Sequence, residues 1–239
     1  MLDGRTRDRV CGVTAIAYAL LMAAGWAAWA GQGLPALDGP STEVASWFVQ
    51  HHDACRVAAI LGSLSLFPLI WYLVCLYGTL RDAEGGNGAV SLVFLGGGLM
   101  TVVFDMMFCQ FLLTAAFRPG QTLPAVTQAL NDLYLGPGVA ALTMYMAMFV
   151  AIALIVLRSG VLPAALGYGA LAVAAAQLLF IPTSFVHEGI FDISKGLLGV
   201  YVPFGSHIVW ILISGIVVLQ HAREPRSVVT PATVGRARA

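Results

Sequence analysis

Six long apolar runs alternate with short polar segments along this chain of 239 residues. Each run is close to the roughly 20 residues that an α-helix needs to cross a hydrocarbon core about 30 Å thick. The pattern therefore predicts an all-α, polytopic membrane bundle with six transmembrane helices in a single domain, residues 1–222. The predicted spans are residues 10–30, 55–80, 89–116, 137–157, 162–184 and 201–219.

The first apolar run has a second interpretation, as the core of a secretory signal peptide. Ala28, Trp29 and Ala30 at its end resemble a cleavage site. The run is longer, however, than the roughly 7–15 apolar residues of a signal-peptide core. Its length therefore favours a retained helix.

Basic residues are distributed unevenly between the two sides that six spans define. If the odd-numbered spans run outward, the side with both termini holds Arg5, Arg7, Arg9, Arg81, Arg158, Arg223, Arg226, Arg236 and Arg238. The other side holds Arg56, Arg118 and Lys195. Because cytoplasmic connections carry the excess of Lys and Arg, both termini are predicted to be cytoplasmic, in a cytoplasmic (plasma) membrane. The polar residues 223–239 are then a cytoplasmic tail, predicted to be disordered.

The outer connections are longer than the cytoplasmic ones, and two of them carry helix signals. Pro40 and Ser41 mark a helix start within residues 31–54, and Pro124 marks another within residues 122–134. Apolar residues follow at helical spacing: Val44, Trp47 and Phe48 in the first segment, and Val126, Leu130 and Leu133 in the second. Both segments are predicted to be short interfacial helices that lie on the outer membrane surface.

The composition indicates a lipid-facing exterior. Hydrophobic residues make up 59% of the chain and charged residues only 10%, whereas a soluble domain carries about 25% charged residues. Lys+Arg and Asp+Glu are equal at 12 each, so no overall field favours nucleic acid as a partner. The predicted partner is the lipid bilayer.

The four cysteines form no CxxC pair and show no metal-ligand spacing. This argues against zinc-ribbon and thioredoxin-like proteins. Cys55 and Cys109 fall near the outer face, where they either bridge or act as small apolar fillers, the usual role of buried cysteine.

Small residues and one proline indicate how the spans pack. Gly96, Gly97 and Gly98 in the third span and Gly167 and Gly169 in the fifth offer surfaces for close helix approach. A proline inside the second span, Pro68, is predicted to kink that helix. The sequence shows no inverted repeat of the kind that marks transporters built from duplicated halves.

Asp105 is the one acidic residue clearly inside an apolar span. A carboxylate at that depth costs several kcal/mol unless it is paired, protonated or facing water. At helical spacing it shares a small, polar face with Gly97, Thr101 and Cys109, so this face is predicted to point into the bundle. Asp105 is either a functional acid that donates a proton or a structural acid that is hydrogen-bonded to a Thr or Gln.

His207 is the second catalytic candidate. It follows Ser206 in the outer half of the sixth span, and Trp210 and Ser214 continue its face. A rise of about 1.5 Å per residue allows a contact with Asp105 but does not require one. The alternative is a histidine that serves only in packing.

A collar of polar residues is predicted at the outer ends of the spans, and it contains Glu188, the third catalytic candidate. Imidazole and carboxylate groups there suit zinc or iron, but no spacing matches a known ligand signature. No metal ligand is therefore predicted and the cofactor is unknown, with a single outer haem left open. The collar residues are His51, His52, Asp53, Arg56, Asp132, His187, Glu188, Asp192 and Lys195.

Aromatic side chains around Asp105 are predicted to line a cavity for a lipophilic small molecule. Aromatic faces stabilise cations, so an acid beside them suits proton-transfer or carbocation chemistry. Ordinary packing of membrane aromatics is the alternative. The predicted substrate-binding residues are Phe104, Phe108, Tyr145, Gln177, Tyr201 and Trp210.

Two turn segments resemble those of a known family. Residues 157–163, LRSGVLP, followed by Leu166, look like the turn between helices four and five of a bacterial six-helix integral membrane family, a domain of unknown function. Residues 80–86, LRDAEGG, resemble its first cytoplasmic turn in high-GC bacteria. The likeness covers most of the chain in helix order, although the Arg and Trp that often follow the proline are missing. The resemblance implies the six-helix fold and no activity.

Three functions fit these features. The first is an embedded enzyme that uses an intramembrane acid on an isoprenoid- or lipid-like substrate. The others are a non-catalytic subunit that binds a partner through its outer loops, and a small proton-coupled transporter. Because the inner halves of the spans carry few polar residues, the sequence favours a one-sided cavity closed by Phe67, Trp71 and the glycine-rich third span, and hence the enzyme. A homodimer or a partner membrane protein is left open.

Overall fold

The computed structural model describes residues 3–35, 39–135, 138–186 and 188–223, and every regular element within these ranges is a helix. His187 and residues 224–239 of the predicted tail lie outside the described residues. Six helical segments are long and apolar enough to cross a membrane, so the predicted multi-pass helical membrane protein is confirmed. The elements are α1 (Gly4–Ala30), α2 (Ser41–Glu84), α3 (Ala89–Phe117), α4 (Pro124–Leu135), α5 (Gly138–Ser159), α6 (Ala164–Gln177), α7 (Phe180–Thr183), the 3-10 helix η1 (Gly189–Phe191), the π-helix η2 (Leu197–Tyr201) and α8 (Val202–Arg223).

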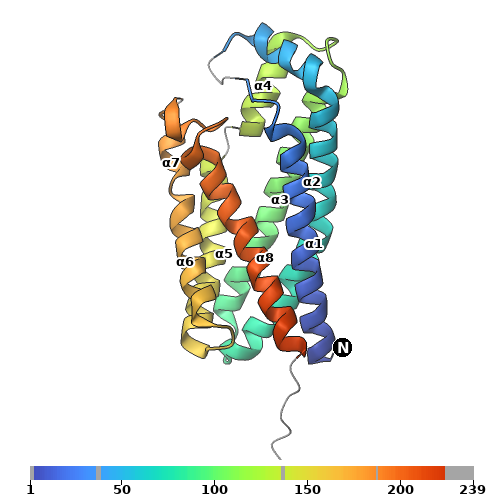
Figure 1. Ribbon diagram of the computed structural model, residues 1–239. Coiled ribbons are helices and arrows are strands. Elements are labelled where there is room, and N and C mark those ends of the chain that lie inside the picture. The colour runs from blue at the N-terminus through green and yellow to red at the C-terminus, as the bar shows by residue number, and fades with distance from the viewer. Residues whose placement is uncertain (1–2, 36–38, 136–137, 187, 224–239) are drawn as a thin grey trace, which may run out of the picture.

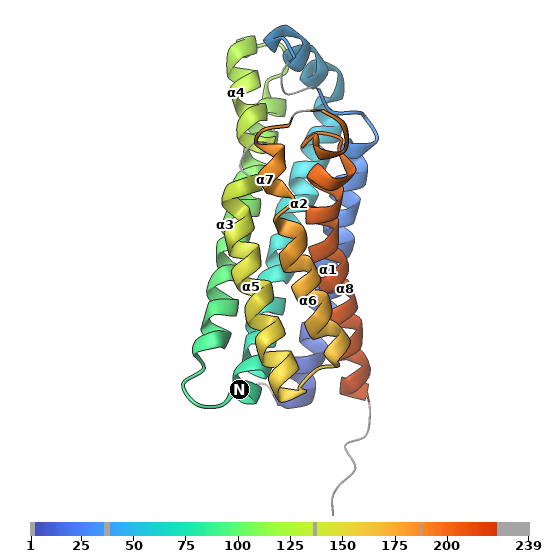
Figure 2. The same ribbon diagram turned by 90° about the vertical axis from the view of Figure 1, so that its left-hand side faces the viewer.

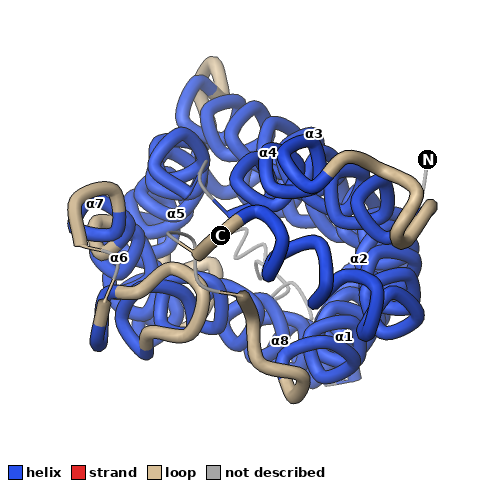
Figure 3. Tube along the Cα trace, turned by 90° about the horizontal axis from the view of Figure 1, so that it is seen from above, coloured by secondary structure: helices blue, strands red, loops and turns tan. Residues whose placement is uncertain are grey.

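The spans form a closed ring. α1 packs on α2, α2 on α3, α3 on α5, α5 on α6, α6 on α8, and α8 packs back on α1, as the view along the bundle shows (Figure 3). The start of α1 and the end of α8 lie at one end of the bundle, which we call the terminal end (Figure 1). The opposite end, with α4, α7 and the long connections, is the loop end (Figure 2).

α2 begins well before its predicted span, because the first outer helix runs directly into it. The one residue inside α2 with non-helical backbone angles is His51, at φ −117° and ψ 16°. The segment before this break lies across the loop end of the ring and buries Val44 and Phe48 (Figures 1 and 3). Pro68 was predicted to kink this helix; the backbone angles stay helical there, and the proline is buried.

α4 differs from the surface helix that the sequence predicts. It begins at Pro124 as expected, but it runs alongside the loop-end part of α3 and also contacts α2 (Figures 1 and 2). Its buried residues include Thr127 and Asn131, whereas Val126 and Leu133 are exposed. Leu130 packs against the loop-end core, so α4 has apolar side chains on both its inner and its outer face, because lipid and protein interior are equally apolar.

Glycine lies at every interface between neighbouring helices of the ring. A Cβ at Gly97 would lie 3.0 Å from backbone atoms of α5, and one at Gly215 would lie 2.4 Å from the Cβ of Ala15. Small residues let membrane helices approach closely in this way. The predicted role of Gly97 is confirmed, while Gly96 faces open space. The interface glycines are Gly25 (α1–α2), Gly62 and Gly98 (α2–α3), Gly97 (α3–α5), Gly167 (α5–α6), Gly169 (α6–α8), and Gly12 and Gly215 (α1–α8).

The cysteines pack as apolar fillers. Cys55 and Cys109 are both free thiols. The sulfur of Cys109 fills the space over Gly62, where a Cβ would lie only 2.7 Å away. Cys55 is fully buried in the loop-end core beside Phe48 and Trp29.

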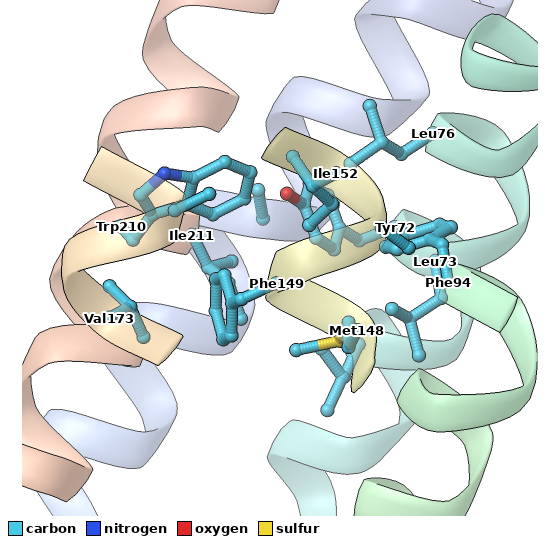
Figure 4. Close-up of a cluster of buried hydrophobic side chains, with 14 of the residues drawn as sticks. Tyr72, Leu73, Leu76, Phe94, Met148, Phe149, Ile152, Val173, Trp210 and Ile211 are labelled. Atoms are coloured by element: carbon cyan, nitrogen blue, oxygen red, sulfur yellow. The ribbon is translucent and has the colours of Figure 1, made fainter. Parts of the chain in front are cut away.

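A dense apolar core fills the terminal-end half of the ring (Figure 4). The prediction that Phe67 and Trp71 close this half is wrong, because Phe67 is 69% exposed and Trp71 46% exposed on the outside of α2. Lipid and protein interior are equally apolar, so the size of a side chain does not indicate which of the two it faces. The closing residues are instead Leu73, Leu76, Phe94, Phe149, Ile152, Trp210 and Ile211.

Candidate functional site

Four polar side chains from four helices meet inside the ring. The hydroxyl of Tyr145 on α5 donates a hydrogen bond to Oδ1 of Asp105 on α3, over 3.0 Å. The hydroxyl of Tyr18 on α1 lies 3.0 Å from Nε2 of His207 on α8. The rings of Tyr145 and His207 are in contact, with 4.7 Å between their centroids. We call Tyr18, Asp105, Tyr145 and His207 the polar quartet.

The helical period of α3 turns Asp105 inward. Asp105 shares a buried face with Thr101 and Gly98, one and two turns earlier in the helix. The hydroxyl of Thr101 donates to the carbonyls of Gly97 and Gly98, each at 2.9 Å, and not to the carboxyl group. The partner of Asp105 is therefore a tyrosine from another helix rather than the Thr or Gln that a purely structural acid was expected to use.

Two atoms of the quartet have no hydrogen-bond partner. Oδ2 of Asp105 and Nδ1 of His207 are both unpaired, although the two residues are only 6% and 2% exposed. The Pro203 carbonyl, one turn before His207, accepts from Nε2 of Gln177 at 3.1 Å. An unpaired buried polar atom costs about 1–3 kcal/mol. The other unpaired buried atoms of the described residues belong to Arg7, Trp47, Asn131 and Gln177, which line neither cavity at the quartet, whereas Asp105 and His207 line both. Oδ2 of Asp105 is available to a ligand, and Nδ1 of His207 has only the Pro203 carbonyl beside it.

A cavity of about 80 Å³ lies on the loop-end side of the quartet. Asp105 and His207 form its floor, and its walls are almost entirely apolar. The connection after α7 contributes Ile193 and Val200 to the wall. The aromatic residues of the walls are Trp26, Trp29, Phe108, Tyr134 and Phe204.

A second, much smaller cavity of about 10 Å³ lies on the terminal-end side of the quartet, with room for one water molecule at most. All four quartet residues line it, together with Thr101 and several apolar side chains. Asp105 and His207 therefore separate two spaces. The next polar pair toward the terminal end is Tyr72 and Ser214, whose hydroxyls are 2.8 Å apart and fully buried in the core.

The structure brings two of the predicted substrate-binding residues to the site. Phe108 lines the larger cavity, and Tyr145 belongs to the quartet. Phe104 packs edge-on against Phe108, with 4.9 Å between ring centroids, but lines neither cavity. It supports the wall from behind.

The other three predicted substrate-binding residues hold the ring together and line neither cavity. Gln177 at the end of α6 donates a hydrogen bond to the carbonyl of Pro203 in α8, which joins the two helices. Trp210 donates its indole N–H to the carbonyl of Leu166 over 3.0 Å, which also joins α8 to α6. Tyr201 is 41% exposed and touches Trp26 edge-on at the outside of the cavity.

Glu188 is not brought to Asp105 and His207. It is exposed at the start of η1 and lines neither cavity. Other collar residues pair locally: Asp53 binds Arg56 at 3.2 Å, and buried Asp192 accepts from the backbone and hydroxyl of Ser194. Across the described ranges, no three His, Cys, Asp or Glu residues are grouped so that they could hold a metal ion. The predicted collar residue His187 lies outside those ranges.

Tyr18 and the tryptophans of α1 were not among the predicted site residues. Tyr18 is fully buried and bonds to His207, and Trp26 and Trp29 form part of the cavity wall. A signal for Tyr18 was present, because it follows Cys11 and Ala15 on a small-residue face of the first span. A tyrosine inside a predicted span indicates a buried polar group in the same way that an acidic residue does.

The arrangement can exchange protons with a bound molecule. Tyr145 holds one oxygen of Asp105 and leaves the other free, and Tyr18 holds one nitrogen of His207 and leaves the other free. If the Tyr18 hydroxyl donates to Nε2, Nδ1 carries the proton and is a donor; if Nε2 donates, Nδ1 is an acceptor. Each tyrosine thus fixes the orientation of one titratable group.

The resemblance to a six-helix family rests on turns that the structure places at the terminal end. Gly160 adopts φ +67° in the α5–α6 turn, and Pro163 is the residue before α6. Comparison of the chain with protein-family models, with curated proteins and with solved structures finds no match.

Proposed function

We propose that this chain is a membrane-embedded enzyme that performs acid–base chemistry on a lipophilic, isoprenoid- or lipid-like substrate. One observation carries the proposal: the unpaired atoms of Asp105 and His207 belong to residues that form the floor of an apolar cavity. A general acid or base must reach the reacting atom directly or through one water. Both side chains meet this requirement because both line the cavity.

A proton shift is the reaction that these two groups complete without a co-reactant. Asp105 gives its carboxyl proton to one carbon of a substrate double bond, and His207 removes a proton from the carbon attached to the other end of that double bond. One C–H bond forms, one C–H bond breaks and the double bond moves, so the numbers of protons and electrons in the substrate are unchanged. The proton on His207 then returns to Asp105 before the next turnover.

The walls of the cavity support the choice of substrate class. Trp26, Phe108 and Phe204 provide aromatic faces above the floor. Such faces exclude water and stabilise the cationic character that develops when a double bond is protonated. A hydrophilic substrate would lose its hydration without finding polar partners on these walls.

The closed terminal half argues for an enzyme over a proton-coupled transporter. A transporter needs polar groups along a path to both ends of the ring. Beyond the smaller cavity, Leu76, Phe149 and Ile152 belong to the buried apolar core, and the hydroxyls of Tyr72 and Ser214 bond to each other. A non-catalytic subunit, in turn, has no use for a buried carboxyl oxygen without a partner.

The proposed orientation places the loop end outside a cytoplasmic membrane. Arg5, Arg7, Arg9, Arg81 and Arg158 belong to the terminal end, where the short α2–α3 and α5–α6 turns lie. The loop end carries Arg56, Arg118 and Lys195. This asymmetry of basic residues favours a cytoplasmic terminal end.

Deuterium incorporation tests the enzyme. Purified protein in detergent is incubated in D₂O with an extract of bacterial membrane lipids and isoprenoids, and the lipids are analysed by mass spectrometry after back-exchange in H₂O. We expect at least one lipid species to retain deuterium on carbon with the wild type and not with Asp105→Asn. Tyr72→Phe, which removes a buried hydroxyl away from both cavities, is the matched control and should retain the activity. No protein-dependent deuterium in any species would refute the proposal.

Cysteine labelling tests the orientation. In a background with the four native cysteines replaced by alanine, a membrane-impermeant maleimide is applied to intact cells. Gln121 and Ser159 are both exposed, at opposite ends of the ring. Gln121→Cys should react at once, and Ser159→Cys only after the cells are permeabilised. The reverse pattern would place the loop end in the cytoplasm.

A further inference from the structure

We propose that the larger cavity opens sideways into the loop-end leaflet of the bilayer between α1 and α8, and that this opening admits a single-chain amphiphile. The polar end of that molecule would bind Asp105 and His207, and its apolar chain would extend past Trp26 and Phe204 into lipid. The choice of a lipophilic molecule rests on the proposed function; the position of the opening rests on the packing of α1 against α8.

α1 and α8 meet closely at the terminal end and separate toward the loop end. At the terminal end a Cβ on Gly12 would lie 2.7 Å from the Gly215 carbonyl, and one on Gly215 would lie 2.4 Å from the Cβ of Ala15. Toward the loop end the two ribbons diverge (Figure 1). Large aromatic rings span the wider part instead: Trp26 on α1 contacts Phe204 on α8 edge-on, with 5.7 Å between ring centroids.

Three side chains at this place are only partly buried. Met22, Trp26 and Phe204 line the cavity and have intermediate exposure. On the opposite wall Ala59 is 1% exposed and Leu112 is 4% exposed, while Cys109 and Tyr134 have intermediate exposure. If a side chain between the cavity and the surrounding lipid rotates away, a lipophilic molecule can pass at that position without crossing water.

The packing at the start of α8 indicates that the cavity would open by rotation of side chains rather than by movement of the helix. The start of α8 follows directly from η2, where the glycines approach the backbone of Asp192 so closely that a Cβ on Gly199 would lie 2.5 Å from its carbonyl oxygen. Asp192 itself is buried and bonded to Ser194. The helix is therefore anchored at both ends of the opening, and the rings of Trp26, Tyr201 and Phe204 are left to rotate.

The polarity of the path identifies the ligand class. The floor offers one carboxyl oxygen and one imidazole nitrogen without partners, which suits a single hydroxyl, amine or carbonyl group. From there to Trp26 the lining is apolar or aromatic. A molecule with one small polar end and one apolar chain matches this order, whereas a two-chain phospholipid has a second chain and a charged headgroup that the lining does not accommodate.

Reversible crosslinking tests the opening. In a background with all native cysteines replaced by alanine, Trp26→Cys and Phe204→Cys are joined by a short bis-methanethiosulfonate reagent in protein reconstituted into phosphatidylcholine vesicles. The vesicles contain an isoprenyl alcohol that carries a photoreactive diazirine, and labelled peptides are identified by mass spectrometry. We expect labelling within Asp105–Leu112 to fall at least fivefold on crosslinking and to return on reduction.

A second pair controls for rigidity of the cavity in general. Trp29 and Tyr134 lie 5.9 Å apart by ring centroid and join α1 to α4 across the same cavity. Crosslinking Trp29→Cys to Tyr134→Cys should leave the labelling intact, and each single cysteine variant treated with the reagent should do the same. Undiminished labelling in the α1–α8 crosslinked protein would overturn the opening, as would an equal loss in the α1–α4 crosslinked protein. Absence of labelling in every protein, crosslinked or not, would instead overturn the lipophilic ligand and the proposed function with it.

Discussion

The same helices pack closely in the terminal-end half of the ring and enclose a cavity in the loop-end half. In the terminal-end half, glycines bring the backbones of α1 and α8 together, and large apolar side chains fill the centre. In the loop-end half the same two helices separate, and a cavity replaces the core. The buried hydroxyls of the terminal half, on Tyr72 and Ser214, bond to each other, whereas the quartet between the halves leaves two atoms unpaired.

This difference separates stability from function within one domain. Close packing and paired polar groups are what a membrane helix bundle needs to be stable. Unpaired polar atoms beside a cavity are a cost that stability alone would not retain. We therefore expect substitutions in the terminal half to change folding and substitutions at the cavity floor to change activity, with little overlap.

The largest expected effect comes from Asp105→Asn. The amide keeps an oxygen for the Tyr145 hydroxyl, but it has no proton to donate. Loss of a general acid lowers activity by about 10²- to 10⁴-fold, and the deuterium assay should register this loss. The folded protein should remain, because an amide is less costly to bury than an ionised carboxyl. Full activity in Asp105→Asn would mean that the acid is structural, and the proton-coupled transporter would fail together with the enzyme.

The packing of the terminal half is tested by Gly215→Ala. The new methyl group would lie 2.4 Å from the Cβ of Ala15, so α1 and α8 would have to move apart. Overpacking of this kind costs about 1–3 kcal/mol, which should appear as a lower midpoint of unfolding in a denaturant titration. Gly205→Ala on the same helix is the control, because no atom lies within 4 Å of its Cβ position. It should be neutral or stabilising by up to about 1 kcal/mol; equal losses for both variants would contradict the packing argument.

A matched pair of tyrosines distinguishes the two halves more finely. Tyr18→Phe removes the hydrogen bond that orients His207, and Tyr72→Phe removes the bond to Ser214. Each loss is worth about 0.5–1.5 kcal/mol. In Tyr72→Phe it should appear only as reduced stability, since the Ser214 hydroxyl still donates to the carbonyl of Ile211.

In Tyr18→Phe the loss of this hydrogen bond should lower the rate of deuterium incorporation by up to about tenfold. Because Tyr18 would act through His207, the pH dependence of the residual activity should also shift, which a purely structural hydroxyl would not cause. The contrast would be lost if both variants changed stability alone, or if both changed activity alike.

The spans were predictable because crossing a bilayer demands about 20 apolar residues, and the sequence meets that demand six times. Asp105 was predictable as well, since a single acid in an apolar run stands out. Whether a given apolar side chain faces lipid or the interior of the bundle was not predictable, because both environments favour the same kinds of side chain. Phe67 and Trp71 were placed inside and lie outside, and Val126 and Leu133 of α4 face outward while Thr127 and Asn131 are buried.

Hydrogen-bond partners from helices far apart in the sequence were not predictable either. Tyr18 and His207 are 189 positions apart, and nothing in either segment indicates the other. The ring order that brings α8 back to α1 creates this pair, and that order follows from glycine contacts such as Gly12 with Gly215 rather than from hydrophobic periodicity. The sequence therefore indicated the two titratable groups of the site and Tyr145, but not Tyr18, whose hydroxyl bonds to His207.

The smallest expected effect belongs to Glu188→Gln, and it tests the boundary of the loop-end half. Sequence reasoning grouped Glu188 with Asp105 and His207, because all three fall on the same side of the membrane. In the structure Glu188 is exposed at η1 and touches neither cavity, so its carboxyl group cannot exchange a proton with a molecule on the floor. Glu188→Gln should therefore match the wild type within about twofold in the deuterium assay, and its unfolding midpoint should be unchanged, since surface substitutions usually stay within about 0.5 kcal/mol. A loss comparable to that of Asp105→Asn would mean that the connection after α7 folds over the cavity during turnover, and the site would then extend into the loops.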